Sequence, residues 1–256
     1  MRGVTSDITV VHVSDFITPP GPATPGMDRR QAIAREGCWI GVSTTDPGVT
    51  SGWHDHGAND TYFVVLRGAM GFEHGEGGRE RIRASTGDFV WLARDVVHRE
   101  GTIGDEAAAA LVFRIGQGPL VVARDGPADQ PASPPTIVRR DELRLPAEVT
   151  PGVTRLEAIQ TDRAWFGRVG NTGRQLSAWH VHPNHDTYGY PVTGRFLADF
   201  GPGGRQRAIA GPGDLIEIPR GVIHREGNPD DGTTDGIVLR VGSGPMTVLL
   251  DGPPEG

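Results

Sequence analysis

The apolar residues of this chain come in short runs, and glycine or polar turn residues separate one run from the next. The clearest runs are residues 61–66, 88–92, 109–115, 215–218 and 236–241. Short apolar runs at this spacing predict the strands of an antiparallel β barrel or sandwich. The best helical candidate is residues 27–36, where two alanines lie among good helix formers, and residues 139–143 are a weaker one. The pattern therefore predicts an all-β chain with few short helices.

The whole pattern repeats at a constant offset of 126 residues. WIG at residues 39–41 recurs as WFG at 165–167, WHDH at 53–56 recurs as WHVH at 179–182, and HREG at 98–101 recurs at 224–227. A fixed period indicates a duplicated unit, and half of 256 residues is an ordinary domain size. The proline-rich segment at 126–136 is typical of a semi-rigid connector. We therefore expect two tandem domains, residues 1–127 and residues 128–256.

Composition and charge argue against several classes of partner. The formal net charge is -7 at pH 7 and the arginines are scattered along the chain, so we expect no nucleic-acid partner. The N-terminus lacks the apolar core of a secretion signal, and no apolar run is long enough to span a bilayer. We therefore expect a cytoplasmic protein with no membrane partner. Matching repeats can dock with pseudo-twofold symmetry, which is compatible with a monomer or a homodimer.

Three histidines recur in each half at the spacing of a metal site. Residues i and i+2 of a strand share one face, so the two histidines of each HxH pair can direct their imidazoles at one point. The third histidine follows 42 residues after the pair in both halves. Imidazole suits iron, nickel, copper and zinc, so we expect one divalent transition-metal ion in each half. The candidate ligands are His54, His56 and His98 in the first half and His180, His182 and His224 in the second.

Carboxylates recur near the histidines as well. Asp60 and Asp186 lie four residues after the second histidine of their half, where a carboxylate could complete the set of metal ligands. Glu100 and Glu226 lie two residues after the third histidine, so on a continuing strand they share its inward face. Both glutamates are candidates for catalytic proton transfer beside the metal, or for pairing with a buried arginine.

These residues resemble the motifs of the cupin superfamily, and the chain is similar to a bicupin. The first cupin motif joins a glycine, an HxH pair, a carboxylate and a second glycine, and the chain offers GWHDHGANDTYFVVLRG at 52–68 and WHVHPNHDTYGYPVTG at 179–194. The second motif is intact as GDLIEIPRGVIH at 213–224 and altered as GDFVWLARDVVH at 87–98. The resemblance implies two double-stranded β-helix (jelly-roll) barrels, each with a metal inside its mouth.

The chain departs from the cupin pattern in two places. The usual carboxylate is glutamate, so Asp60 and Asp186, which are one methylene shorter, either reach the metal or leave three histidines and water. In the first half, Ala93 and Asp95 replace the proline and glycine that the second half keeps in its second motif. We therefore expect a looser turn before His98, unequal metal occupancy, and chemistry dominated by one half.

The ligand set resembles that of quercetinase-like and diketone-cleaving dioxygenases. This resemblance implies a metal-dependent dioxygenase that acts on a small enolisable or aromatic compound, with Fe(II) as the first candidate and Mn, Ni, Cu or Zn as alternatives. An anionic small-molecule substrate, together with O2, would complete the coordination of the ion. Two alternatives stay open. One is a metal-dependent lyase or isomerase working through an enediolate, with Glu100 or Glu226 moving the proton, and the other is a cupin that binds a ligand without turnover.

Overall fold

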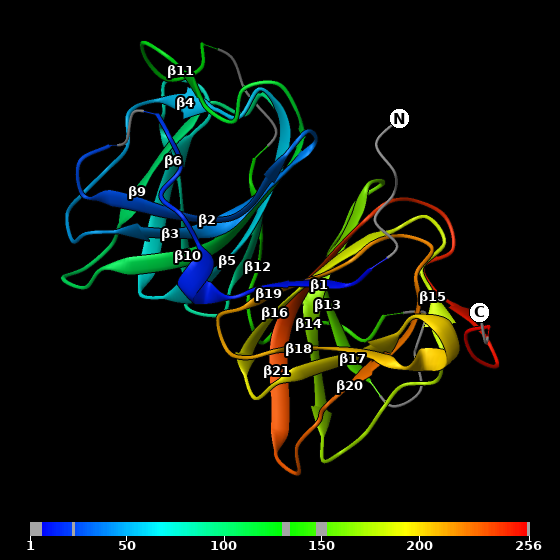
Figure 1. The fold of residues 1–256 in the computed structure, drawn as a ribbon. Coiled ribbons are helices and arrows are strands. Elements are labelled where there is room, and N and C mark those ends of the chain that lie inside the picture. Colours follow the sequence, from blue (N-terminus) through cyan, green and yellow to red (C-terminus); the bar gives the residue numbers. More distant parts are fainter. Residues whose placement is uncertain (1–6, 22–23, 130–133, 147–152, 255–256) are drawn as a thin grey trace. The chain divides into compact units, whose positions relative to one another are not determined.

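The computed structural model describes residues 7–21, 24–129, 134–146 and 153–254. In these ranges the chain is built mainly from antiparallel strands, which confirms the all-β class (Figure 1). The helical segments of the described ranges are two three-residue 3-10 turns, Val13–Asp15 and Pro202–Gly204. No helix in this part of the chain has the length and apolar character that crossing a membrane requires.

The chain divides into two compact units. The first-half unit covers Phe16–Glu142, and the second-half unit covers Leu143–Gly256 together with Met1–Asp15. Each unit contains one six-stranded and one five-stranded sheet. Both sheets of a unit supply side chains to one hydrophobic core, as expected of a jelly roll, in which two sheets pack face to face.

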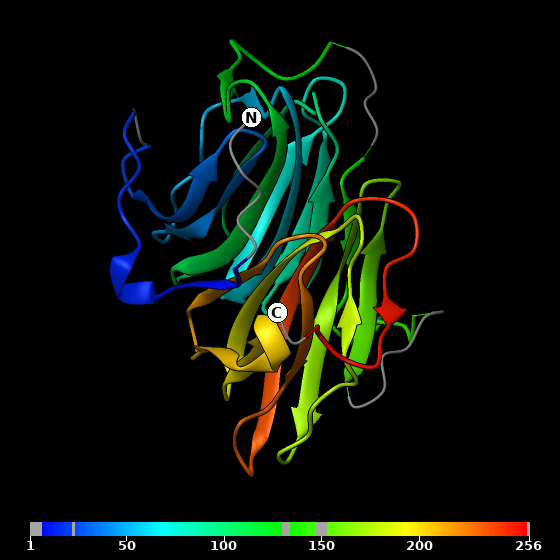
Figure 2. The ribbon, with the colours of Figure 1, turned by 45° about the vertical axis from the view of Figure 1, so that its right-hand side comes forward.

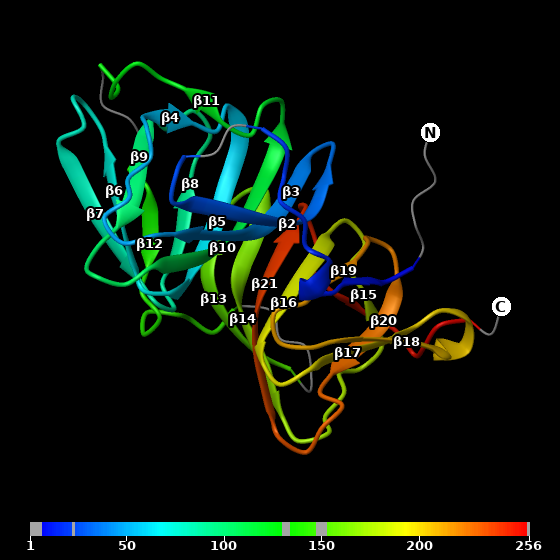
Figure 3. The ribbon, with the colours of Figure 1, turned by 60° about the vertical axis from the view of Figure 1, so that its left-hand side comes forward.

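The first-half unit orders its six-stranded sheet β12-β8-β5-β10-β3-β2 and its five-stranded sheet β11-β4-β9-β6-β7. Figure 3 shows β4 and β11 side by side at one end of this unit. Its core joins Trp39 and Phe63 of the larger sheet to Phe72 of the smaller. The strands are β2 (Met27–Arg35), β3 (Cys38–Thr45), β4 (His54–Asp55), β5 (Ala58–Arg67), β6 (Ala69–His74), β7 (Glu80–Ser85), β8 (Phe89–Leu92), β9 (His98–Thr102), β10 (Ala108–Gln117), β11 (Val122–Ala123) and β12 (Thr136–Val138).

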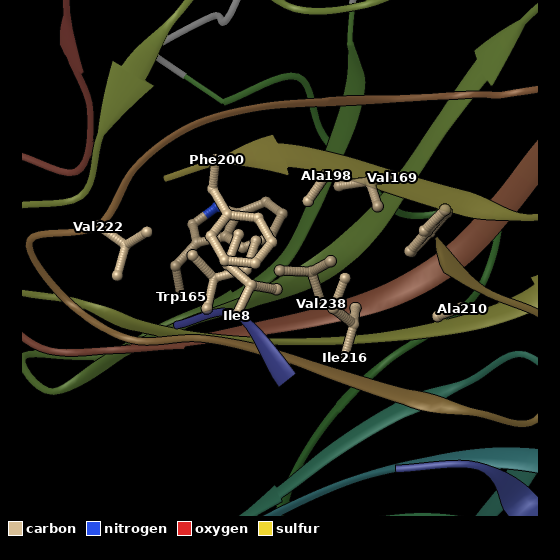
Figure 4. Packing of buried hydrophobic residues seen from close by; sticks show 11 residues of the cluster. Ile8, Trp165, Val169, Ala198, Phe200, Ala210, Ile216, Val222 and Val238 are labelled. Atoms are coloured by element: carbon tan, nitrogen blue, oxygen red, sulfur yellow. The ribbon is translucent and has the colours of Figure 1, made fainter. Parts of the chain in front are cut away.

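The second-half unit has sheet orders β1-β19-β16-β21-β14-β13 and β18-β17-β20-β15-β22. In Figure 2 the yellow-green β14 and the orange-red β21 lie side by side although they are distant in sequence. Figure 4 shows Phe200, Trp165 and Ile8 packed together in the core of this unit. The strands are β1 (Thr9–Val11), β13 (Thr154–Gln160), β14 (Ala164–Thr172), β15 (His180–Val181), β16 (Asp186–Thr193), β17 (Phe196–Phe200), β18 (Gln206–Ala210), β19 (Leu215–Ile218), β20 (Ile223–Gly227), β21 (Thr233–Val241) and β22 (Val248–Leu249).

Each six-stranded sheet takes one edge strand from the other half of the sequence. The N-terminal β1 pairs with β19 of the second-half unit (Figure 1), and β12, which occupies the corresponding place in the second repeat, pairs with β8 of the first-half unit. The compact units therefore differ from the boundary expected after residue 127 by this exchange of strands. The boundary of the repeat and the boundary of the folded body are different because pairing partners can be far apart in sequence.

The aspartate of the second motif fastens each exchanged strand. Asp214 accepts hydrogen bonds from the Val13 amide at 2.9 Å and from His12 Nδ1 at 3.1 Å. Its counterpart Asp88 accepts from Arg139 Nη1 at 2.7 Å and from the Arg140 amide at 3.2 Å. These aspartates thus have a structural role that their place in the motif did not reveal.

Replacing Asp214 with alanine is expected to destabilise the second-half unit by about 1.5–3 kcal/mol, because it removes charge-assisted hydrogen bonds to the N-terminal strand. The urea midpoint, followed by tryptophan fluorescence, measures the loss. Asp231→Ala is the matched control, since its ion pair with Arg174 is exposed and worth about 0–1 kcal/mol. Equal urea midpoints for the two variants would contradict the stabilising role of Asp214.

The hydrogen bonds to Asp214 also predict how the stability of the second-half unit depends on pH. Burial opposes ionisation of Asp214, but the amides of Val13 and Gly211 and the ring of His12 outweigh it and lower the pKa. A carboxyl whose pKa is lower in the folded than in the unfolded chain stabilises fully above the unfolded value of about 4, and this stabilisation is lost as the pH falls. The difference in urea midpoint between wild type and Asp214→Ala should therefore shrink on acidification through that range.

The helix predicted for residues 27–36 is wrong. Met27–Arg35 forms strand β2, which pairs antiparallel with β3 and bulges between Gln31 and Ile33. The helix propensity of alanine is a weak preference that tertiary contacts override. Here the ladder to β3 and the hydrogen bond from Trp39 Nε1 to Gln31 Oε1 at 3.0 Å hold the segment extended. The weaker candidate around residue 139 forms a turn in which the Glu142 amide donates to the Arg139 carbonyl at 2.9 Å.

Candidate metal centres

The first-half histidines converge on one buried point. His54 on β4 pairs directly with His98 on β9, and His56 lies two residues beyond His54. The ring centroids of the three are 4.5, 4.9 and 5.2 Å apart, and their candidate ligand atoms all lie within 4.8 Å of one another. The strand alternation expected from the HxH spacing is therefore realised in the fold.

Hydrogen bonds fix which nitrogen of each ring faces the centre. His54 Nδ1 lies 2.9 Å from the Gly52 carbonyl and His98 Nδ1 lies 2.8 Å from the Val96 carbonyl. A carbonyl can only accept, so both Nδ1 atoms carry the proton and both Nε2 lone pairs point inward. His56 Nδ1 contacts Thr61 Oγ1 at 2.6 Å, which orients the third ring. This is the arrangement by which proteins orient metal-binding imidazoles.

The second-half triad repeats the arrangement. The ring centroids of His180, His182 and His224 are 4.3, 4.9 and 5.1 Å apart. Their Nδ1 atoms lie 2.5–2.9 Å from backbone carbonyls, those of Ala178, Met246 and Val222. None of the three Nε2 atoms has a hydrogen-bond partner among the described residues. Buried polar atoms without a protein partner usually bind a water or an ion, and three such nitrogens converging on one point fit a divalent metal.

Burial also sets the protonation state of these rings. It lowers the pKa of His98 and His180, and it lowers the pKa of His56 and His182 strongly. For His224, burial and the neighbouring His180 lower the pKa to about 4. These imidazoles are therefore neutral at physiological pH, which is the form that binds metal.

The aspartates predicted as ligands are directed elsewhere. Asp60 Oδ2 lies 3.0 Å from Arg94 Nη2, and Asp186 accepts from the amide of Arg220 at 2.9 Å and from its Nη2 at 2.6 Å. Neither aspartate belongs to the groups whose ligand atoms converge. Successive side chains of a strand point to opposite faces, and Thr61, the next residue after Asp60, is the one that contacts His56. The structure thus pairs Asp60 and Asp186 with arginines rather than with the histidine triads.

The two glutamates lie on the inward face, but their partners differ. Glu100 Oε2 is 3.4 Å from His54 Nε2 and 3.5 Å from His98 Nε2. Glu226 Oε1 instead lies 3.5 Å from Arg155 Nη2 and 3.6 Å from Arg240 Nη2, so the pairing with buried arginine is realised in the second half.

Both glutamates are ionised. Burial opposes ionisation of Glu100, but His54, His98 and Arg114 outweigh it and lower the pKa. The same opposition holds at Glu226, where Arg240, His180 and Arg155 prevail and lower the pKa to about 2. A carboxylate with a lowered pKa is a poor proton donor at neutral pH, which weighs against the role of general acid.

Two buried arginines beside the triads were not predicted from the sequence. Arg114 on β10 is 6% exposed, and its Nη2 lies 3.3 Å from His56 Nε2. Arg240 on β21 occupies the matching position and is 0% exposed. Each guanidinium lies over the tryptophan of its own half, Trp39 or Trp165, at 5.4 or 5.8 Å from the ring centroid. The available signal was an arginine at equivalent positions of two apolar runs, LVFRIG and IVLRVG.

Arg114 stays charged despite its burial. Burial and the neighbouring Arg29 lower its pKa, but only to about 10. A charged, buried guanidinium near a metal site is suited to hold an anion.

Comparisons with known proteins agree with this architecture. The family model described as Cupin domain matches residues 41–114. A structure of Bacillus subtilis oxalate decarboxylase, from a study of its Mn(II) centres, aligns with a TM-score of 0.73 over 97% of this chain and 81% of that chain, at 16% identity. The formate complex of Lactobacillus farciminis oxalate decarboxylase aligns with a TM-score of 0.70 over 97% and 90%, at 13% identity. Residues 41–114 therefore match the cupin domain family, and the chain as a whole shares the fold of these oxalate decarboxylase structures. A search of curated protein sequences gave no match.

The turn before the third histidine has a left-handed residue at the same position in both halves although its sequence differs. Gly221 has a left-handed backbone with φ of 80°, and Asp95, the residue that replaces glycine in the first half, adopts φ of 61°. Aspartate tolerates this region better than most residues. The Asp95 amide donates to the Gly57 carbonyl at 3.1 Å, which ties the turn to the segment after His56. The altered motif therefore still delivers His98 to the triad.

Cavities lie beside both histidine triads. A cavity of about 460 Å³ lies against the first triad, and its lining includes His54, Arg114, Arg29, Trp39 and Ser51. Inside each barrel a smaller cavity lies beside the glutamate, about 40 Å³ at Glu100, where His56 and His98 also line it, and about 30 Å³ at Glu226. The first site thus offers room for a small substrate next to its metal ligands.

Proposed function

We propose that this protein is a metal-dependent lyase that decarboxylates oxalate or a similarly small carboxylate, and that Mn(II) is its metal. The observation that carries the proposal is the charged, buried Arg114 facing the first triad at the wall of a 460 Å³ cavity. The oxalate decarboxylase neighbours support the lyase alternative over the dioxygenase that the sequence resemblance implied. The Mn(II) centres of the Bacillus subtilis enzyme favour manganese over Fe(II).

The two triads fit the metal that this proposal needs. Neutral imidazoles leave the net charge of a divalent ion in place, and an ion held by three of them keeps open positions. Such an ion would act as a Lewis acid towards a carboxylate oxygen of the substrate.

Arg114 is proposed to hold the substrate anion. Its guanidinium now faces His56 Nε2, whose lone pair a metal would occupy. With that lone pair engaged, the N–H groups of Arg114 are left to a carboxylate, for which the planar fork is well matched. Trp39 covers the guanidinium and reduces its contact with water, which strengthens the attraction.

Glu100 and Arg114 give the site one negative and one positive charge. In decarboxylation the bond between the carboxylate and the adjacent carbon breaks, CO2 leaves, and that carbon takes up one proton. Because Glu100 is ionised, the proton that ends on carbon must come from solvent or another group in the cavity.

The test measures products and oxygen together. Protein reconstituted with Mn(II) is incubated with oxalate and other small mono- and dicarboxylates, while CO2, the second product and dissolved oxygen are followed. Release of CO2 and formate from oxalate without net oxygen uptake is the expected result. Oxygen consumption with flavonols, β-diketones or catechols would instead support a dioxygenase, and ligand binding without any product would support a binding protein.

A further inference from the structure

Glu100 occupies a place that the metal sites described above leave undefined. Its carboxylate lies 3.4 Å from His54 Nε2 and 3.5 Å from His98 Nε2, whereas the aspartate at the expected ligand position pairs with Arg94. We propose that Glu100 is the fourth protein ligand of the first-half metal ion, and that Asp60 is not a ligand. This inference rests on the metal binding assumed in the proposed function.

The distances match those of ligands that share one ion. Nitrogen and oxygen ligands lie about 2.1 Å from a divalent transition metal, so two of them at angles of 90–110° are roughly 3.0–3.4 Å apart. Glu100 Oε2 lies 3.4 Å from His54 Nε2 and 3.5 Å from His98 Nε2. A metal can therefore bind the three atoms together with little movement of the side chains.

Neighbouring groups brace Glu100 in this position. Ser51 Oγ donates to Glu100 Oε2 at 3.2 Å and accepts from the Glu100 amide at 3.0 Å. The Ser51 amide also donates to the Glu100 carbonyl at 2.8 Å. Such support is typical of groups that orient metal-binding carboxylates. Glu100 is 16% exposed at its side chain, so the ion it would bind is largely shielded from solvent.

The second half carries the same residue without the same contacts. Glu226 is held at 3.5 and 3.6 Å by the guanidinium groups of Arg155 and Arg240, and its main chain is tied to Ser177 as that of Glu100 is to Ser51. Two arginines compete with a metal for this carboxylate. The geometry therefore assigns four protein ligands to the first ion and three to the second.

Metal affinity tests the assignment without any turnover assay. All variants are made in a His224→Ala background, which disables the second site, and each is stripped with a chelator and titrated with Mn(II) by calorimetry. Glu100→Gln should weaken Mn(II) binding by at least the roughly 10- to 100-fold seen when a group supporting a metal site is lost. Asp60→Asn and Glu226→Gln should stay within a few-fold of the background. The Mn(II) EPR spectrum should change for Glu100→Gln alone.

The possible outcomes separate the two proposals. Unchanged affinity and spectrum for Glu100→Gln, or a loss confined to Asp60→Asn, overturns the assignment of Glu100 while leaving the proposed enzyme intact. Absence of Mn(II) binding in the background protein, with its circular dichroism unchanged, overturns both. If Glu100→Gln does not fold, Glu100→Asp replaces it, and the shorter carboxylate should weaken binding without removing the charge.

Discussion

Replacing His98 with alanine is expected to remove the first-half metal ion and to lower kcat/KM for decarboxylation by about 10³-fold or more. Lewis-acid stabilisation by a bound metal is worth several kcal/mol, and each 1.4 kcal/mol is about a factor of ten in rate. His224→Ala should remove the second ion with a far smaller loss of activity, because the large cavity opens at the first triad. Metal analysis of each purified variant, together with steady-state kinetics, measures both effects.

Two results would contradict this division of labour. Equal partial losses for His98→Ala and His224→Ala would show two working sites. A dominant loss for His224→Ala would place the chemistry in the second half, where all three Nε2 atoms lack hydrogen-bond partners among the described residues. Circular dichroism and urea unfolding control for loss of structure, since both histidines are buried at about 1% exposure or less.

Replacing Arg114 with methionine is expected to lower kcat/KM by about 10- to 150-fold while metal content stays unchanged. A charge-assisted hydrogen bond is worth about 1.5–3 kcal/mol, which is the interaction that the substrate anion would lose. Methionine keeps much of the volume over Trp39 but carries no donor. The loss should appear mainly in KM if Arg114 binds the carboxylate equally in the ground and transition states.

Two matched variants define what the Arg114 result means. Arg174→Met removes an exposed arginine whose partner is Asp231, and it should leave activity unchanged. Arg240→Met removes the buried arginine of the second half, and it should mainly destabilise the protein, because Glu226 loses one of its cationic partners. A loss of metal in Arg114→Met would show instead that the arginine organises the triad rather than binding substrate.

The local patterns of the sequence were sufficient for the repeat, most strands and both triads. The apolar runs at 61–66 and 109–115 lie within β5 and β10, and the run at 236–241 lies within β21. Strand alternation placed His54 and His56 on one face, and the glutamates two residues after the third histidines on the inward face. These properties follow from the two-residue period of a strand, so they depend on neighbours in the chain.

Other features depended on partners far away in the sequence. Residues 27–35 form a strand because the ladder to β3 and the hydrogen bond from Trp39 to Gln31 outweigh the helix propensity of alanine. Likewise, β1 joined the second-half unit because its ladder forms with β19, some 200 residues away, which no local pattern encodes. The repeat and the proline-rich connector at 126–136 predicted the boundary at residue 127.

The identity of the carboxylate beside the metal was also decided by the tertiary structure. By sequence, Asp60 and Asp186 stand where a ligand is expected, but Arg94 and Arg220 pair with them on the other side of the strand. The spacing shows which residues share a face, whereas the partner of a buried charge depends on which opposite charges the fold brings within reach. The sequence by itself therefore determined the duplicated all-β chain and its six histidines. Only the packed sheets placed Glu100 and Arg114 beside them.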